Sequence, residues 1–183
     1  MHPILREGEF LKENAILTRI NKVLPVTAIL ICLVAIAAAQ QEYSFTTSGG
    51  QTVPVSSMRG KVVVLLFSGT QDPQRREGLK ALESLAQRYQ NKDVKVCWVA
   101  VNGPAELSDA QLSSIGASAP HVTILRDANQ AAFKHFSGKL AQLPTIVVLD
   151  PQGNPAGQPR GGFNPNSDFI NDLASTIDGL LRR

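Results

Sequence analysis

Cysteine is scarce in this 183-residue chain, which has only Cys32 and Cys97. Cys32 lies in an apolar N-terminal stretch, so removal of that stretch would leave one thiol and no possible intrachain disulfide. Histidine is also rare: His2, His121 and His135 lie far apart, and none has a cysteine at a zinc-ligand spacing. We therefore expect no metal site and no disulfide framework.

Charged residues are sparse too, at 18% of the chain, and the formal net charge is +3. The basic residues form neither a long run nor a stripe interleaved with aromatic side chains, which is the pattern typical of nucleic-acid binding. We therefore expect no nucleic-acid partner, and no motif in the sequence indicates a cofactor.

Two export interpretations compete for the N-terminus. Residues 1–22 are polar and mixed in charge, and residues 23–39 are apolar apart from one threonine. As a signal peptide, the segment has Arg19 and Lys22 as its positive flank and small alanines before the cut, and we favour this interpretation. As a membrane anchor, the apolar run lies at the short end of the about 17–25 residues that a spanning helix needs. Both place the domain at 42–183 outside the cytoplasm, periplasmic or secreted, and only an uncleaved segment would contact a membrane.

The central pattern is a strand followed by a helix. Val62–Phe67 is an unbroken apolar run bracketed by glycines, which is typical of a strand buried on both faces of an α/β sheet. Apolar residues at helical spacing follow from Leu79 to Tyr89. Asp72 as N-cap and Pro73 at the first helical position make a favourable helix start.

Further apolar runs complete an α/β pattern. We predict a hairpin at 43–55 with Pro54 on an edge strand, and helices capped by Ser108 and by Asp127. Other buried strands and a last helix are expected at 94–101, 122–125, 146–149 and 165–181. The predicted fold is α/β, a mixed sheet of about four or five strands flanked by helices.

The stretch Gly60–Glu77 resembles TlpA-like redoxins of the thioredoxin superfamily, which belong with the AhpC/TSA redoxins. Those proteins have a Gly-Lys pair, an apolar strand ending in Phe, and a Trp-Cys-x-x-Cys loop that opens a long helix. The ungapped comparison places Gln71 on the tryptophan and Asp72-Pro73-Gln74-Arg75 on Cys-x-x-Cys. A one-residue gap places Gln71-Asp72-Pro73-Gln74 there instead, and neither alignment supplies a cysteine.

A second part of the resemblance is Leu143–Gly153, in which Pro144-Thr145 precedes an apolar strand and then Asp-x-x-Gly. In thioredoxins the proline at this point is cis and lies beside the active-site loop. The resemblance therefore predicts a cis Leu143–Pro144 bond, and the alternative is an ordinary trans proline at the first residue of a strand. The resemblance covers about residues 42–181 and implies a thioredoxin-like fold.

The missing thiols govern the functional prediction. Dithiol exchange needs a thiolate of lowered pKa and a second thiol that resolves the mixed disulfide. Peroxiredoxins need Thr-x-x-Cys near this position, but Thr70 is followed by Gln71, Asp72 and Pro73. Cys97 lies in an apolar strand, where a buried cysteine behaves as a small hydrophobic residue.

We therefore predict a non-catalytic module that binds a partner protein or an extended peptide. Thioredoxins pair peptide backbone beside the cis proline, and the resemblance implies the same surface here. This surface combines Pro144 and Thr145 with the loop that precedes the helix. We expect Gln71 and Arg75 of the loop to be exposed. The loop consists of Thr70, Gln71, Asp72, Pro73, Gln74 and Arg75. A simpler interpretation is that Asp72 only caps the helix. The alternative function is a thiol-disulfide oxidoreductase or antioxidant protein with an atypical site, in which Cys97 would serve.

Overall fold

β3 (Val62–Ser68) is the centre of the sheet, and all of its residues are buried. It pairs in parallel with β4 (Val94–Ala100) and antiparallel with β6 (Thr145–Leu149). Strands on both of its edges and helices on both of its faces exclude polar side chains until its last residue, Ser68. The predicted buried central strand is confirmed.

The computed structural model describes residues 42–140, 142–162 and 167–182. The predicted polar lead, 1–22, and the predicted export segment, 23–39, lie outside these residues. In the described part of the chain, no helix is long and apolar enough to cross a membrane.

Seven strands form one mixed sheet in the described ranges, in the order β2-β1-β5-β4-β3-β6-β7. The expected four or five strands were too few. The predicted hairpin joins the sheet through β5, with Pro54 in the edge strand. β7 has two residues in a stretch without an alternating apolar pattern, so only its pairing with β6 identifies it. The outer strands are β1 (Ser44–Thr46), β2 (Thr52–Pro54), β5 (Thr123–Arg126) and β7 (Arg160–Gly161).

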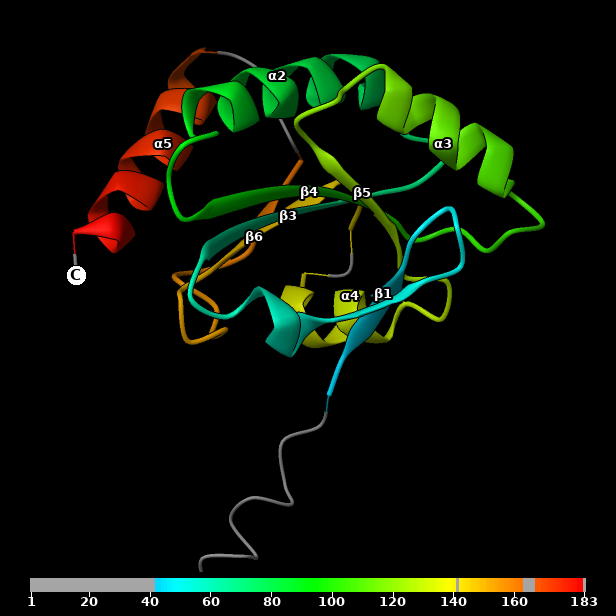
Figure 1. Cartoon of the computed structure of the whole chain (residues 1–183), viewed down its shortest axis with the longest axis horizontal. Coiled ribbons are helices and arrows are strands. Elements are labelled where there is room, and N and C mark those ends of the chain that lie inside the picture. Colours follow the sequence, from blue (N-terminus) through cyan, green and yellow to red (C-terminus); the bar gives the residue numbers. More distant parts are fainter. Residues whose placement is uncertain (1–41, 141, 163–166, 183) are drawn as a thin grey trace, which may run out of the picture. The chain divides into compact units, whose positions relative to one another are not determined.

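Helices cover both faces of the sheet (Figure 1). α2 (Arg75–Arg88), α3 (Asp109–Ala117) and α5 (Ser167–Leu181) pack on one face, and α4 (Ala131–Ser137) packs on the other with the short 3-10 helix η1 (Val55–Met58). Side chains of β3 alternate between the two cores, because successive residues of a strand point to opposite faces. Val62, Val64 and Leu66 enter the core under α2 and α5, and Val63, Leu65 and Phe67 enter the core next to α4.

The two predicted helix caps act in different ways. Ser108 forms a capping box, in which its Oγ accepts from the Gln111 N–H at 3.3 Å and Gln111 Oε1 accepts from the Ser108 N–H at 2.9 Å. Asp127 is not the N-cap residue as predicted, because α4 begins at Ala131 and its N-cap is Gln130; the Asp127 Oδ2 nevertheless accepts from the Phe133 N–H in the first turn at 2.7 Å. Burial raises the pKa of the Asp127 carboxyl above its ordinary value.

Candidate functional site

The sheet register brings the predicted loop and the proline segment together at the carboxyl end of β3. Phe67 pairs with Thr145 in the antiparallel ladder, so one further step places Ser68 beside Pro144 and the next places Gly69 beside Leu143. A Cβ on Gly69 would lie 3.7 Å from Leu143 Cδ1, which agrees with this register. The Leu143–Pro144 bond is cis, as predicted.

β4 holds the other side of the loop. The Val101 N–H donates to the Ser68 carbonyl at 3.1 Å, and the Thr70 N–H donates to Asn102 Oδ1 at 2.8 Å. The Asn102 amide also donates to Glu106. Asn102 was not among the predicted site residues, although it directly follows a buried strand, and the carboxyl ends of neighbouring parallel strands meet at one edge of a sheet.

Asp72 organises the loop from inside. Ser68 Oγ donates to Asp72 Oδ2 at 2.8 Å, and the Gln74 N–H donates to Asp72 Oδ1 at 3.0 Å. The predicted start of the helix was wrong: α2 begins at Arg75 with Gln74 as its N-cap residue. An aspartate that bonds the N–H two residues further on forms a turn of its own, so Asp72 and Pro73 belong to a turn that precedes the helix.

The loop residues differ in exposure. Gln71, Pro73 and Gln74 are exposed, whereas Thr70 and Asp72 are half-buried. Gln71 is therefore exposed as predicted. Arg75 is half-buried, contrary to the prediction, because residues four apart share a helix face and Leu79 lies in the core.

The proline segment combines buried polar contacts with one exposed apolar side chain. Thr145 is buried, and its Oγ1 donates to the Gln142 carbonyl at 2.5 Å. The Pro144 carbonyl accepts from the Gly162 N–H at 2.9 Å, which ties the segment to the end of β7. Among the described residues, Leu143 is the one large hydrophobic residue that is exposed, with 39% of its surface accessible.

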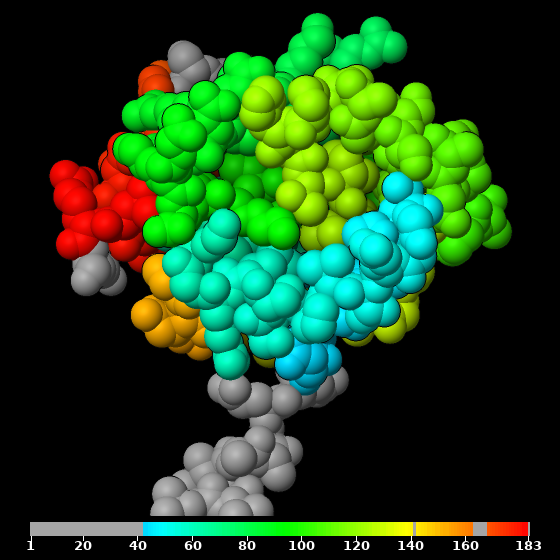
Figure 2. Space-filling view, in the orientation of Figure 1, coloured from blue at the N-terminus to red at the C-terminus, as the bar shows by residue number. Residues whose placement is uncertain are grey.

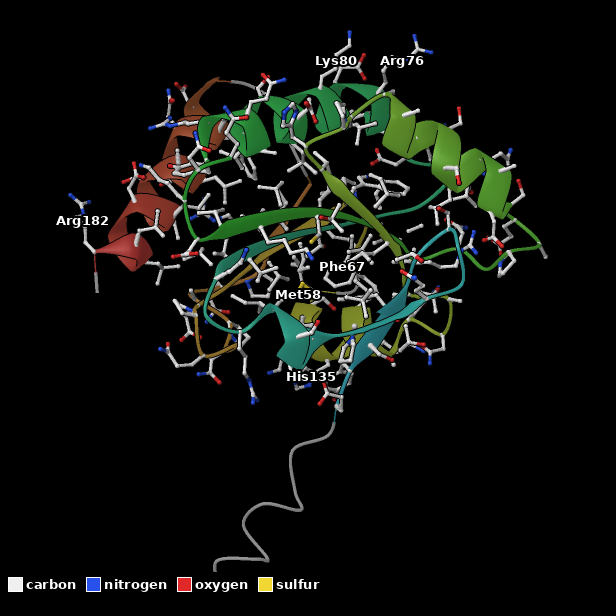
Figure 3. The ribbon with its side chains drawn as sticks, viewed as in Figure 1. Met58, Phe67, Arg76, Lys80, His135 and Arg182 are labelled. Carbon is white, nitrogen blue, oxygen red and sulfur yellow. The ribbon has the colours of Figure 1, made fainter. Side chains whose placement is uncertain are left out.

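The remaining candidate groups lie away from this site. Cys97 is fully buried in the middle of β4, opposite Leu65, and burial raises the pKa of its thiol to about 12. His135, labelled in Figure 3, stacks on Tyr43 with ring centroids 4.3 Å apart. His121 contacts Glu83 of α2. Across the described residues, no group of three or more His, Cys, Asp or Glu side chains could hold a metal ion.

A buried parallel strand pair, an antiparallel strand led by a cis proline, and a loop that opens a long helix beside that proline define a thioredoxin-like domain. The chain belongs to the AhpC/TSA family, whose family model matches residues 36–154, more than half of the chain. No curated protein sequence matches the chain significantly.

Solved structures agree with the thioredoxin-like fold. The exposed lipoprotein thioredoxin of Streptococcus pneumoniae is 19% identical, with a TM-score of 0.61, and the match covers 76% of this chain and 100% of that one. A thiol:disulfide interchange protein of the thioredoxin family from Chlorobium tepidum is 19% identical, with a TM-score of 0.60, and the match covers 76% of this chain and 93% of that one. The protein from Chlorobium tepidum is described as a thiol:disulfide interchange protein, whereas the loop at Thr70–Arg75 of this chain contains no cysteine.

Proposed function

We propose that this chain is an exported thioredoxin-like domain without thiol chemistry, which binds a partner protein or an extended peptide at Thr70–Arg75 and Leu143–Thr145. The observation that carries the proposal is Leu143, which is 39% exposed and lies next to the cysteine-free loop at Gly69. An exposed apolar side chain with polar loop residues around it suits an apolar residue of a partner, because binding surfaces combine an apolar centre with a polar rim.

Charge near the loop favours an acidic partner. Arg76 and Lys80 are exposed and project away from α2 (Figure 3). Arg75, Arg76 and Lys80 stand against a single acid, Glu77, so the beginning of α2 has an excess of positive charge. Carboxylates of a partner would gain charge-assisted contacts with these side chains.

The state of Cys97 supports the absence of thiol chemistry. A thiol must ionise and reach its disulfide substrate to exchange with it. Cys97 has no exposed surface, and its pKa is raised to about 12. The alternative of an atypical oxidoreductase that uses Cys97 therefore has no support in the geometry.

The export part of the proposal rests on the apolar segment 23–39 and on the proteins that share the fold. One of those proteins is described as an exposed lipoprotein and another as a thiol:disulfide interchange protein. N-terminal mass analysis of the protein from its native cells tests this part, and an intact Met1 on protein from the cytoplasmic fraction would contradict it.

A titration with carboxymethylated insulin B chain, an extended peptide with blocked thiols, tests the binding proposal. We expect amide shifts of the ¹⁵N-labelled full chain to change at the loop and at Leu143–Thr145. Leu143→Asp should weaken binding by about tenfold, because it puts a charge where an apolar contact is expected. Gln87→Asp, on an exposed position of α2 outside the loop, is the matched control and should change little.

A parallel insulin-reduction assay separates binding from catalysis. The full chain should give no turnover above buffer. Turnover that Cys97→Ser abolishes would contradict the non-catalytic part of the proposal, and shifts confined to another surface would contradict the binding part.

A further inference from the structure

β4 begins before its neighbour β5, and this offset opens a notch in the sheet. Val94 is the first residue of β4, but β5 first pairs with it at Cys97, opposite Thr123. Within the described residues, the edge of Val94–Val96 that faces β5 therefore has no strand beside it. A pocket of about 300 Å³ lies there, between this edge and the last turns of α2. We call it the β4 notch, and Figure 2 shows a hollow on this face between the green residues of α2 and the yellow-green residues near 120.

Three basic residues line the β4 notch: Lys61, Lys95 and His121. Val63 of β3 pairs with Lys95 of β4. Lys61 precedes Val63 by two residues, so it lies beside the start of β4. Cys97 pairs with Thr123, so His121 stands at the level of Lys95 on the other side. The basic residues thus form a row across the starts of three strands. By register, Lys95 and Thr123 share the face of Val63 and Cys97, whereas His121 contacts Glu83 on the α2 side, so the lining surrounds the open edge from both faces of the sheet. Gln90 and Thr123 add an amide and a hydroxyl donor to it.

Among the residues that the structure describes, no carboxylate side chain lines this notch. The acid next to it, Glu83, is already engaged by His121: the Glu83 Oε1 to His121 Nδ1 distance is 2.5 Å, and Glu83 Oε2 accepts from the His121 N–H at 3.0 Å. Burial raises the pKa of Glu83, but hydrogen bonds from His121 and Gln87, with the charge of His121, together outweigh it and leave that pKa below its ordinary value. In the described part of the chain, neither Lys61 nor Lys95 forms an ion pair with a carboxylate.

We propose that the β4 notch binds a small oxyanion, a phosphate or sulfate group. Lysines gathered without an acidic partner repel one another, and a multivalent anion between them removes that repulsion while it accepts hydrogen bonds from the amide and the hydroxyl. A volume of about 300 Å³ exceeds the size of a bare anion, so the same notch also accommodates a phosphate carried on a small organic molecule. The notch is at the amino ends of β3 and β4, whereas the loop site is at the carboxyl end of β3, so this site is independent of the proposed function.

The test is an NMR titration of the ¹⁵N-labelled full chain with inorganic phosphate, with sodium chloride adjusted to keep the ionic strength constant. We expect saturable shifts at Lys95, His121 and Thr123 and no matching change at the loop site. Lys95→Gln should weaken phosphate binding by about tenfold, because it removes one charge-assisted contact. Lys139→Gln is the matched control, because Lys139 is exposed just after α4, lies outside the lining of the notch, and should leave the affinity unchanged.

Two further experiments distinguish a free phosphate from an organic phosphate and control for a variant that does not fold. Glycerol phosphate that binds more tightly than inorganic phosphate identifies an organic phosphate as the ligand, and the reverse order identifies the free anion. Lys61→Gln provides a second variant if Lys95→Gln loses its dispersed amide spectrum. The proposal is overturned if phosphate gives no saturable shifts at the notch, or if the folded notch variants and Lys139→Gln lose affinity equally.

Discussion

Two segments meet at the carboxyl end of β3, and they differ in what they share with thiol-exchange proteins. The Leu143–Thr145 segment has the cis proline and leads an antiparallel strand of the sheet. The Thr70–Arg75 loop occupies the reactive position but contains no cysteine, and polar bonds hold it instead, from Ser68 to Asp72 and from Thr70 to Asn102. The comparison teaches that backbone register and internal hydrogen bonds are sufficient to build the geometry of this site, whereas the chemistry requires particular side chains.

The largest expected effect concerns Cys97. If this thiol were reactive, the chain would have thiol chemistry outside the loop, and the absence of cysteine from the loop would not set it apart from thiol-exchange proteins. In the full chain with Cys32→Ser, we expect a disulfide reagent at about pH 8 to label native Cys97 about three orders of magnitude more slowly than the unfolded chain, since burial raises its pKa to about 12. Absorbance of the released thiol, with and without denaturant, measures both rates. Equal rates would show that Cys97 is accessible and ionisable.

The second prediction supplies the missing chemistry to the loop. The Arg75 N–H donates to the Asp72 carbonyl at 3.3 Å, so these residues span one turn, with Cα atoms close enough for a disulfide. We expect Asp72→Cys with Arg75→Cys to reduce insulin at least about a hundredfold faster than the wild type. The controls are Asp72→Cys alone, which lacks a resolving thiol, and Gln71→Cys with Gln74→Cys, which tests the gapped alignment. A double variant that folds, forms the disulfide and remains inactive would show that the proline segment and the loop do not form a working site.

The smallest expected effect sharpens the other half of the comparison, the proline segment. Gly161 of β7 lies against this segment so closely that a Cβ would be 2.2 Å from Gln142 Nε2 and 2.8 Å from Leu140 Cδ2. Gly161→Ala should lower the free energy of unfolding by about 1 kcal/mol, because only the ends of the flexible Gln142 and Leu140 side chains must move aside. Denaturant unfolding measures this loss. Gly103→Ala, with no atom within 4 Å of the added Cβ, is the matched control, and equal effects of the two variants would contradict the close packing.

Local pattern was sufficient for most of the fold. The apolar run that became β3, the cap at Ser108 and the cis bond at Pro144 followed from neighbouring residues or from the resemblance. The start of α2 could not be predicted in this way, because Asp72 can cap a helix or close a turn, and the hydroxyl of Ser68 favours the turn. β7 was missed for a similar reason: two residues have no periodicity, and pairing alone makes them a strand.

The sequence by itself determined the order of the helices and of every strand but β7, and the absence of a cysteine from the loop, because burial patterns and residue chemistry are local properties. Only the tertiary structure decided that Asn102 holds Thr70, that Leu143 lies exposed beside Gly69, and that the residues of the β4 notch gather at one edge. Each of these contacts joins residues far apart in the chain. Their distances depend on which strands pair and in which register, and that choice is made by the packing of the whole sheet.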